Sequence, residues 1–486
     1  MADEKKLTTR AEDFSEWYNE IVLRSELADY APVRGSMVIR PWGYGIWENM
    51  QRALDAMLKD TGHENAYFPL LIPMSFIERE KAHVEGFAPE LAIVTHAGGK
   101  QLEEPYAIRP TSETIIYAMY AKWVQSYRDL PILMNQWANV MRWELRTRLF
   151  LRTTEFLWQE GHTAHATAAE AEAEALMILG VYRRFMEEWI AMPPFTGVKS
   201  DTERFAGAVK SHSCEALMQD NKALQAGTSH FLGQNFAKQF DLKFQSEAGQ
   251  EEYAWNTSWG VSTRLVGGMV MSHGDDAGLV VPPKIAPIQA VIVPILGGED
   301  EAPVRAKTEE VAARLKSAGV RVKVDARDHI SAGAKYYEWE RKGVPFRIEI
   351  GPKDLAKGSV ALVRRVTPEG EKRKAFIPEA EAIATLPARL DAFQGELLEA
   401  ARRRRDANTV RGVTSIDELA EALDGGAGFV FTGWSGDPAV EAEIKERTKA
   451  TLRAIVDEEF RSPSAPAKCV SGKGASVAEV AWARAY

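Results

Sequence analysis

The segment VVPPKIAP at residues 280–287 limits how this chain of 486 residues can fold, because it separates two stretches of different character. Its three prolines, Pro282, Pro283 and Pro287, can continue neither a helix nor a central strand. A chain of this length also exceeds what one hydrophobic core usually encloses. We therefore predict two or three domains, with one boundary at this segment.

The stretch before the boundary mixes a helical pattern at residues 47–62 with strand-like runs rich in aromatic and β-branched side chains. The strand-like runs are residues 106–110, 130–144, 151–159, 253–260 and 269–281. They are spaced irregularly, unlike the regular strand–helix alternation of a doubly wound fold. The spacing predicts an α+β domain at residues 1–285, built on a mainly antiparallel sheet with flanking helices.

Beyond the boundary the pattern becomes regular. Strand-like and helical segments alternate from QAVIVPIL onward, which predicts a small α/β domain over a parallel or mixed sheet at residues 286–385. A charged helix from about residue 380 then leads into a third unit, residues 386–486. This unit reads as helix, strand, helix and tail, and we expect a small α+β domain.

Composition narrows the possible partners and the compartment. The formal net charge of −9 argues against a protein that coats nucleic acid, because that mode needs a broad excess of Lys and Arg. The two cysteines, Cys214 and Cys469, lie far apart, which fits a reducing compartment. No apolar run approaches the ~18 residues of a membrane span. We expect a cytoplasmic protein without a membrane partner.

A cluster of four arginines at residues 142–152 predicts an anion site. Arg142 and Glu144 alternate along a predicted strand and so share one face, and Arg152 and Phe156 alternate in the same way. A guanidinium binds phosphate bidentately, and an aromatic ring stacks on a purine. With Arg264 after the glycine-containing segment SWGVST, these residues favour a nucleoside triphosphate as the ligand. A single arginine, by contrast, is usually a solvated surface charge.

These motifs resemble a known family. RWE at 142–144, RTTEF at 152–156 and GVSTR at 260–264 resemble motifs 2 and 3 of class II aminoacyl-tRNA synthetases, and the helix and strand ending near Pro69 resemble the dimer-forming motif 1. Five further segments resemble prolyl-tRNA synthetases of the archaeal and eukaryotic type. They are RPTSET (109–114), FLWQEGHTAH (156–165), LQAGTSHFLGQNF (224–236), TSWGVSTR (257–264) and HGDDAGLVVPPKIAPIQ (273–289).

The resemblance, which runs from about residue 10 to Tyr486, implies a fold and a reaction. It implies a class II catalytic domain, then an anticodon-binding domain and a C-terminal domain. The implied enzyme activates L-proline with ATP to prolyl-adenylate and transfers it to the 3′ end of tRNA(Pro), as a homodimer. Mg²⁺ is expected on the β- and γ-phosphates, since it prefers phosphate oxygens.

The resemblance also assigns site residues. Glu113 would meet the secondary ammonium of proline, and the catalytic residues would be Arg142, which bridges the proline carboxylate and the α-phosphate, and Arg264. Glu144 and Phe156 would hold adenine, and Arg152 would bind the γ-phosphate together with Arg264. The implied proline-binding residues are Phe87, Thr111, Glu113, Arg142, Trp158, Glu160, His162 and Gly260. The implied ATP-binding residues are Arg142, Glu144, Arg152, Phe156, Gln225, Thr228, His230, Ser262 and Arg264.

In the second domain the segment WERKGVPFRIEIGPKDL resembles the family's anticodon-reading segment, with Glu340, Arg347 and Lys353 as candidate contacts. A solvated strand face is the alternative for these charges. Many relatives hold zinc on four cysteines in the C-terminal domain, but here Ser435 stands where one is expected and only Cys469 remains. We therefore expect no zinc. We also expect no editing domain between motifs 2 and 3.

Two other functions stay open from the sequence. The first is another class II synthetase with the same domain order, charging threonine or glycine. The second is a non-catalytic tRNA-binding or regulatory relative that keeps the fold. The sequence motifs WQEGH and QAGTSH favour proline, and a regulatory relative would be expected to lack Arg142, Arg264 or the T-x-E loop.

Overall fold

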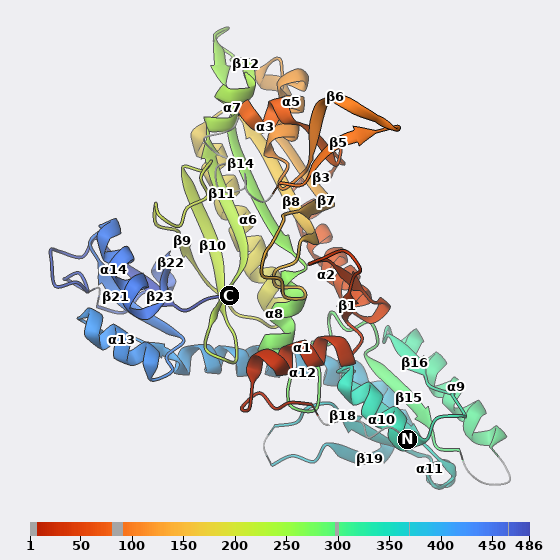
Figure 1. The fold of residues 1–486 in the computed structure, drawn as a ribbon. Coiled ribbons are helices and arrows are strands. Elements are labelled where there is room, and N and C mark those ends of the chain that lie inside the picture. Colours follow the sequence, from red (N-terminus) through yellow and green to blue (C-terminus); the bar gives the residue numbers. More distant parts are fainter. Residues whose placement is uncertain (1–6, 80–90, 297–300, 369, 465) are drawn as a thin grey trace.

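One large sheet organises the computed structural model, which describes residues 7–79, 91–296, 301–368, 370–464 and 466–486 (Figure 1). Its eleven strands have the order β20-β21-β23-β22-β9-β10-β11-β14-β8-β7-β3. Neighbours pair antiparallel except β3/β7 and β20/β21. The strands are β3 (Glu64–Asn65), β7 (Ile132–Met141), β8 (Glu155–His165), β9 (Phe195–Val198), β10 (Lys210–Leu217), β11 (Ala223–Gly233), β14 (Trp255–Ser262), β20 (Thr409–Val410), β21 (Phe429–Trp434), β22 (Thr451–Val456) and β23 (Ala478–Ala483).

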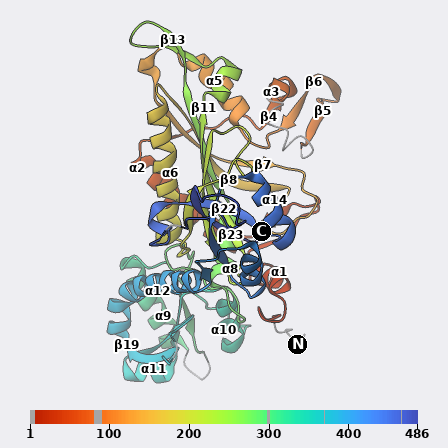
Figure 2. The same ribbon diagram turned by 90° about the vertical axis from the view of Figure 1, so that its left-hand side faces the viewer.

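Helix α6 (Ala168–Glu188) covers one side of this sheet and runs along its strands (Figure 2). It begins with a capping box, in which the Thr167 hydroxyl accepts from the N–H of Glu170 and the Glu170 carboxylate accepts from the N–H of Thr167. Its buried face packs closely on the sheet, because a Cβ at Gly227 of β11 would lie 3.3 Å from the ring of Tyr182. Helix α6 thus closes one face and leaves the other for a site.

The remaining helices and small sheets of the first 285 residues surround this sheet. Helices α1, α2 and α8 contribute most of the main hydrophobic core together with α6. Their bounds are α1 (Phe14–Arg24), α2 (Pro41–Asp60), α3 (Met74–Arg79), α5 (Glu113–Trp123), α7 (Asn235–Phe240), α8 (Arg264–His273) and the 3-10 turn η2 (Tyr127–Asp129). The small sheets contain β1 (Ala28–Tyr30), β2 (Met37–Ile39), β4 (Leu71–Pro73), β5 (Ile93–Ala97), β6 (Lys100–Ile108), β12 (Lys243–Gln245) and β13 (Glu251–Tyr253).

A second body follows the proline-rich segment and has its own core. Its five-stranded sheet has the order β16-β15-β17-β18-β19, in which the first three strands are parallel, β18 is antiparallel to β17, and β19 is antiparallel to β18. This confirms the α/β prediction over a mixed sheet. Its elements are β15 (Ala290–Pro294), α9 (Ala302–Ser317), β16 (Val322–Val324), α10 (Ala332–Arg341), β17 (Phe346–Ile350), α11 (Pro352–Lys357), β18 (Ser359–Arg364) and β19 (Lys374–Pro378).

The C-terminal part is joined to both other bodies. Helix α12 (Glu379–Ala407) runs without a break from the second body to the C-terminal part, so the expected boundary at residue 385 falls inside one helix (Figure 1). Strand β22 pairs with β9, with Val456 opposite Gly197, so the C-terminal strands extend the main sheet. Besides β20–β23, this part contains α13 (Ile416–Asp424), α14 (Pro438–Thr448) and the 3-10 turn η3 (Glu458–Phe460).

Two expectations about local structure were wrong. The run 269–281 is not a strand: its first part belongs to helix α8, and Gly274 ends that helix. Helix α8 is buried from Leu265 to Ser272, and the periodicity of an apolar run this short does not distinguish a fully buried helix from a buried strand. The tail after α14 also contains two central strands, β22 and β23, which the sequence pattern did not reveal.

The strand β8 depends on a glycine that faces the core. A Cβ built on Gly161 would lie 1.9 Å from the ring of Trp259, which is itself buried. Gly161→Ala should therefore lower the free energy of unfolding by about 1–3 kcal/mol or more through overpacking, which would be read from the midpoint of thermal unfolding. The matched control is Gly180→Ala inside α6, where no atom lies within 4 Å. That change should stabilise the helix by about 0.5–1 kcal/mol, and similar losses for both variants would contradict the packing argument.

Candidate active site

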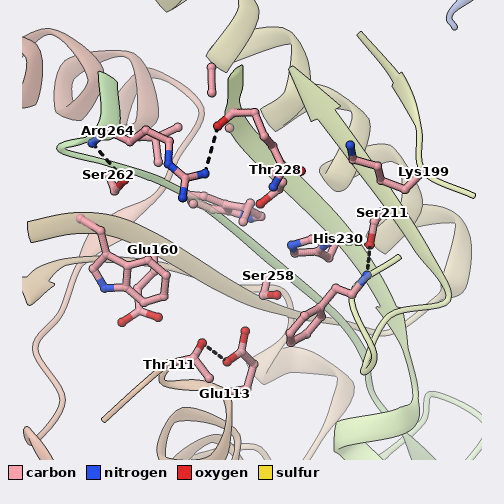
Figure 3. A pocket seen from close by; sticks show the side chains of 18 of the residues that line it. Thr111, Glu113, Glu160, Lys199, Ser211, Thr228, His230, Ser258, Ser262 and Arg264 are labelled. Carbon is pink, nitrogen blue, oxygen red and sulfur yellow. Dashed lines mark hydrogen bonds between the residues drawn. The ribbon is translucent and has the colours of Figure 1, made fainter. Parts of the chain in front are cut away.

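A pocket of about 1110 Å³, including space open to solvent, lies on the face of the main sheet opposite α6 (Figure 3). Strand register explains which side chains reach it. Trp158, Glu160 and His162 alternate along β8, and the paired residues of β14 are Ser262, Gly260 and Ser258. Strand β11 continues the same rows with Thr228 and His230. The period-2 alternation of these strands thus builds the pocket floor.

Several buried polar atoms around this floor have no partner among the described residues. They are Trp158 Nε1, His162 Nδ1 and Ser258 Oγ. Most buried polar atoms in proteins are hydrogen-bonded, and an unpaired one is costly. Three such atoms lining one pocket indicate that it is built to receive a polar ligand.

Glu160 is the most densely bonded acid of the pocket. Its carboxylate accepts from Ser112 Oγ at 2.5 Å and from Gln136 Nε2 at 2.8 Å, and it lies 3.0 Å from His162 Nε2. Burial favours the neutral forms of Glu160 and His162, but the attraction between their charged forms outweighs the effect of burial. The pKa of Glu160 is lowered and the pKa of His162 is raised. The two form a buried ion pair that fixes the His162 ring against the ligand space.

Thr111 and Glu113, at the start of α5, form a wall of the pocket beside the floor made by the strands. The Thr111 hydroxyl donates to the Glu113 carboxylate, and the two lie together at one end of the pocket (Figure 3). Glu113 is only 5% exposed, and the helix N-terminus favours its negative charge. This end of the pocket therefore offers a fixed carboxylate to a small cationic group.

Arg142 lies between this wall and the aromatic floor. Its Nε donates to the carbonyl of Pro110 at 3.0 Å, and its guanidinium lies 5.5 Å from the Phe156 ring and 5.7 Å from the Trp158 ring. The prediction that Arg142 and Glu144 alternate along a strand was wrong, because β7 ends at Met141. The same prediction for Arg152 and Phe156 was also wrong, because β8 begins only at Glu155. Only the backbone N–H of Arg142 continues the pairing, by donating to Thr154.

Arg264 closes the other end of the pocket (Figure 3). Its guanidinium donates to the carbonyls of Leu151 and Gln225 at 3.2 and 3.3 Å. Burial, together with the positive charges of Arg142 and Arg152, lowers the pKa of Arg264 to about 10. Cations held this close repel one another, so a bound anion would be strongly favoured here.

Thirteen of the predicted site residues line this one pocket: Thr111, Glu113, Arg142, Phe156, Trp158, Glu160, His162, Gln225, Thr228, His230, Gly260, Ser262 and Arg264. Glu144 and Arg152 lie outside the lining and pair with each other at 2.9 Å. Burial lowers the pKa of His230 to about 3, and its Nδ1 lies 2.8 Å from Ser211 Oγ, so this histidine is neutral. Phe87 falls outside the described residues.

Sequence reasoning missed one wall of the pocket. The additional lining residues include Lys199, Glu203, Arg204, Phe205, Ser211 and Ser258. Most belong to the stretch 199–211, which carries no motif. No local sequence signal marks it, because only strand pairing in the folded chain places these residues here: Ser211 pairs with His230, and Lys199 donates its N–H to the carbonyl of Ser211. Lys199 therefore lies in the same row as the pocket histidines.

The candidate anticodon residues are only partly brought together. Glu340 and Arg347 line a small depression of the second body, where Glu340 lies 2.8 Å from Arg373. Arg347 lies 2.9 Å from Glu349 and stacks 4.0 Å from the centre of the Tyr336 ring. Lys353, in the first turn of α11, is exposed and does not line this depression.

In the C-terminal part, Cys469 lies among serine hydroxyls. The sulfur of Cys469 accepts from Ser471 Oγ at 3.2 Å. Burial alone would raise the pKa of Cys469, but hydrogen bonds from Ser435 and Ser471 lower it. Within the described residues no three His, Cys, Asp or Glu side chains gather as a metal site. Among all the residues that the structure describes, every helix is too short or too polar to cross a bilayer.

Comparison with known proteins gives a consistent assignment along the chain. Residues 95–273 match the tRNA synthetase class II core domain (G, H, P, S and T), residues 289–388 an anticodon binding domain, and residues 416–486 the C-terminal domain of prolyl-tRNA synthetase. The chain is 54% identical to the proline–tRNA ligase of Chloroherpeton thalassium over 99% of its length and all of the relative. It is 54% and 52% identical to those of Chlorobium phaeobacteroides and Chlorobaculum tepidum, with both chains fully covered.

The buried Glu160–His162 pair predicts a pH dependence of stability. Because the folded pKa of His162 is raised, the stabilisation is complete below about pH 6.5 and is lost as pH rises through that raised pKa. The melting temperature of the wild type should therefore exceed that of His162→Gln by more at pH 6 than at pH 9. The change should be on the order of 1 °C or more, measured by calorimetry. An equal difference at both pH values would show that the pair is not ionised.

The matched control is His96→Gln, which changes an exposed histidine on β5 in the same way. It separates the effect of the buried pair from that of the substitution itself. Its melting temperature should stay within about 1 °C of the wild type at both pH values, as for surface substitutions in general.

Proposed function

The chain belongs to the proline–tRNA ligase family, and from this premise we propose how its residues divide the reaction among them. The enzyme activates L-proline with ATP to prolyl-adenylate and transfers the prolyl group to the 3′ end of tRNA(Pro), releasing AMP and pyrophosphate. The observation that carries the proposal is the single pocket in which Thr111, Glu113 and Trp158 lie beside Arg142 and Arg264.

Arg142 is proposed to hold the two reactants together. Attack of the proline carboxylate on the α-phosphate brings two anions into contact, and a guanidinium between them lowers their repulsion and stabilises the transition state. The carboxylate is already ionised at neutral pH, so this step needs no general base. The anchoring of Arg142 to the Pro110 carbonyl supports this role, because a hydrogen bond to the backbone fixes the orientation of the guanidinium.

The proline end is proposed to be the wall around Thr111 and Glu113. The Glu113 carboxylate would pair with the secondary ammonium of proline, and Trp158 and His162 would flank the pyrrolidine ring, with Gly260 leaving space for it. Glu160 is then a supporting group, since its oxygens are occupied by Ser112, Gln136 and His162. Phe87 remains part of the proposed pocket and lies outside the described residues.

The nucleotide end is proposed to lie between Phe156 and Arg264. Phe156 would stack on adenine, and the residues proposed to line the ribose and phosphates are Gln225, Thr228, His230 and Ser262. Arg264 and Arg152 would bind the γ-phosphate and Glu144 the adenine, which requires the Arg152–Glu144 pair to separate. Mg²⁺ would bind through the ATP phosphates and supply further positive charge, since it prefers phosphate oxygens.

The arrangement of domains is proposed to be that of the archaeal and eukaryotic type, although the relatives compared above come from bacteria. The division is 1–285, 286–385 and 386–486. Between β8 and β14 the chain forms α6, β9–β11, α7 and the β12–β13 hairpin, with no separate editing domain among these described residues. In the archaeal and eukaryotic type the C-terminal tyrosine can approach the active site, and Tyr486 matches it. Its hydroxyl donates to Asp220 at 2.6 Å, and Arg148 of the motif 2 loop lies over its ring.

Two partner surfaces complete the proposal. The anticodon of tRNA(Pro) would contact Glu340, Arg347 and Lys353, supported by the match of this body to an anticodon-binding domain. A homodimer would form through the motif 1 segment, where β3 is an edge strand and the side chains of Tyr44 and Tyr67 are exposed. An exposed aromatic side chain at Tyr67, two residues after an unpaired edge strand, favours a protein partner.

The alternatives left open by the sequence are not supported. The relatives compared here are proline–tRNA ligases over their full length, which argues against threonine or glycine as substrate. A non-catalytic relative would be expected to lose the arginines or the T-x-E loop, and Arg142, Arg264, Thr111 and Glu113 all line the pocket.

Arg142→Ala should abolish adenylate formation and leave the fold intact. The variant loses the cation between the two anionic reactants, and removal of one such stabilising donor typically costs about 10²–10³ in kcat. The assay is proline-dependent exchange of pyrophosphate into ATP. The control is Arg146→Ala in the same loop, which is exposed and does not line the pocket. The same assay with alanine, threonine and glycine tests substrate choice, and near-normal exchange by Arg142→Ala would remove Arg142 from its role.

Glu113→Gln should weaken proline binding far more than ATP binding. The amide keeps the size of the side chain but loses the charge that attracts the proline ammonium. The KM for proline should therefore rise by about tenfold or more, as expected for loss of a buried charge pair, while the KM for ATP changes little. Equal increases in both constants would exclude Glu113 as the partner of the ammonium.

A further inference from the structure

A buried charge cluster joins the C-terminal part of the chain to the active-site pocket. Lys199 Nζ donates to Glu215 Oε1 at 2.6 Å and to the carbonyl of Arg453 at 2.6 Å, and Arg453 Nε donates to Glu215 Oε2 at 2.9 Å. The three side chains are 3%, 1% and 9% exposed. Lys199 lines the pocket, whereas Arg453 belongs to β22 of the C-terminal part.

Irregular strand pairing aims the members of this cluster at one another. The pairing of β22 with β23 shifts between Leu452 and Ala454, so Arg453 is the residue left out of the ladder. The pairing of β10 with β11 shifts next to Glu215. Bulges of this kind redirect side chains and are common beside active sites. Two of them within one cluster indicate that the contact between Arg453 and Glu215 is a built feature of the sheet.

The charge of the cluster points to a ligand. Two cations share one carboxylate, so the three buried side chains together carry one net positive charge, and the next acid that acts on Lys199 is Glu203 of the pocket wall. A buried charge that lacks a partner is costly. An ammonium has three N–H donors, and the described protein groups accept two of those of Lys199. An anionic oxygen in the adjoining pocket would accept the third and balance the charge.

The electrostatic surroundings agree with this position. Burial lowers the pKa of Lys199, and the pKa of nearby Arg264 also responds to the charges of Glu215 and Arg453. The cluster and the nucleotide-binding arginine therefore belong to one electrostatic neighbourhood. In Figure 3, Lys199 and Ser211 lie on the wall across the ligand space from Thr111 and Glu113.

We propose that Arg453 is a positioning residue of the active site: it holds Glu215, which in turn holds the ammonium of Lys199 for a phosphate oxygen of the nucleotide. This inference rests on the reaction assigned to the pocket above. It gives the C-terminal part a role in adenylate formation, a step that takes place without tRNA. The contact is distinct from that of Tyr486, which involves Asp220.

The test is pyrophosphate exchange by the full-length protein carrying Arg453→Met, Lys199→Met or both. Arg453→Met should lower kcat by about 10- to 100-fold, because misplacing a reacting group by about 1 Å can cost on the order of 100-fold. If Arg453 acts through Lys199, the double variant should be no slower than Lys199→Met alone. Effects that simply multiply would overturn the proposal, because independent sites give additive free energies.

The matched control is Asp457→Asn, which changes a charged residue at the same strand junction. Asp457 bonds to Thr196 of β9 and has no contact with Lys199 among its hydrogen bonds and ion pairs. Its kcat should stay within about twofold of the wild type, as expected for a change away from the site. If Asp457→Asn and Arg453→Met lower kcat equally, the junction is merely structural and the proposal fails.

Two further measurements keep the outcome decisive. Arg453→Lys keeps the positive charge. If Arg453→Met does not yield folded protein, Arg453→Lys replaces it in the comparison of single variants with the double variant that also carries Lys199→Met. It should restore part of the lost kcat, and no rescue in a folded variant would count against the proposal. Pyrophosphate exchange by the wild type with proline is the separate check on function, and its absence would overturn the assigned reaction. If the wild type is active but the effects of Arg453→Met and Lys199→Met on kcat multiply, only this inference is overturned.

Discussion

The repulsion between fixed positive charges is the constraint on which the active site depends. Hydrogen bonds to backbone carbonyls fix Arg142 and Arg264 in one pocket, although burial and the charges of Arg142 and Arg152 lower the pKa of Arg264. Such a group can stay in place only if the surrounding sheet does not relax. The antiparallel ladder and the close packing of α6 supply that rigidity, so the binding energy of the proposed nucleotide would not be used to assemble the site.

The same rigidity would allow the proposed proline end of the pocket to be selective. Gly161 lets the Trp259 ring pack directly against β8 on one face, while Trp158, Glu160 and His162 project from the other. The Glu160–His162 pair has its own protein partners, so it shapes the pocket without competing for the ligand. A cavity with fixed walls discriminates between substrates by their fit, although one extra or missing methylene of a substrate changes the binding free energy by only about 1–3 kcal/mol.

Much of the fold and of the site could be predicted because strand periodicity and motif spacing are local properties. Trp158, Glu160 and His162 were predicted from the family resemblance, and their common row follows from alternation once β8 is seen to continue past the predicted end at residue 159. Arg142 and Glu144 were misplaced because no local signal showed that β7 ends at Met141. Lys199 and Arg453 were missed for a different reason: their contact joins residues 254 positions apart through strand pairing. Pairings of that kind depend on tertiary structure, which no sequence window contains.

Continuity of the sheet changes how the C-terminal part should be regarded. A domain joined by a flexible linker would move independently, but here α12 is one helix and β22 hydrogen-bonds to β9. Gly197 makes this junction possible, since a Cβ there would lie 2.2 Å from the carbonyl of Ile455. The close approach of the two strands brings Arg453 within reach of Glu215. The C-terminal part is therefore better understood as an extension of the catalytic sheet than as an appended domain, whether or not it binds a metal.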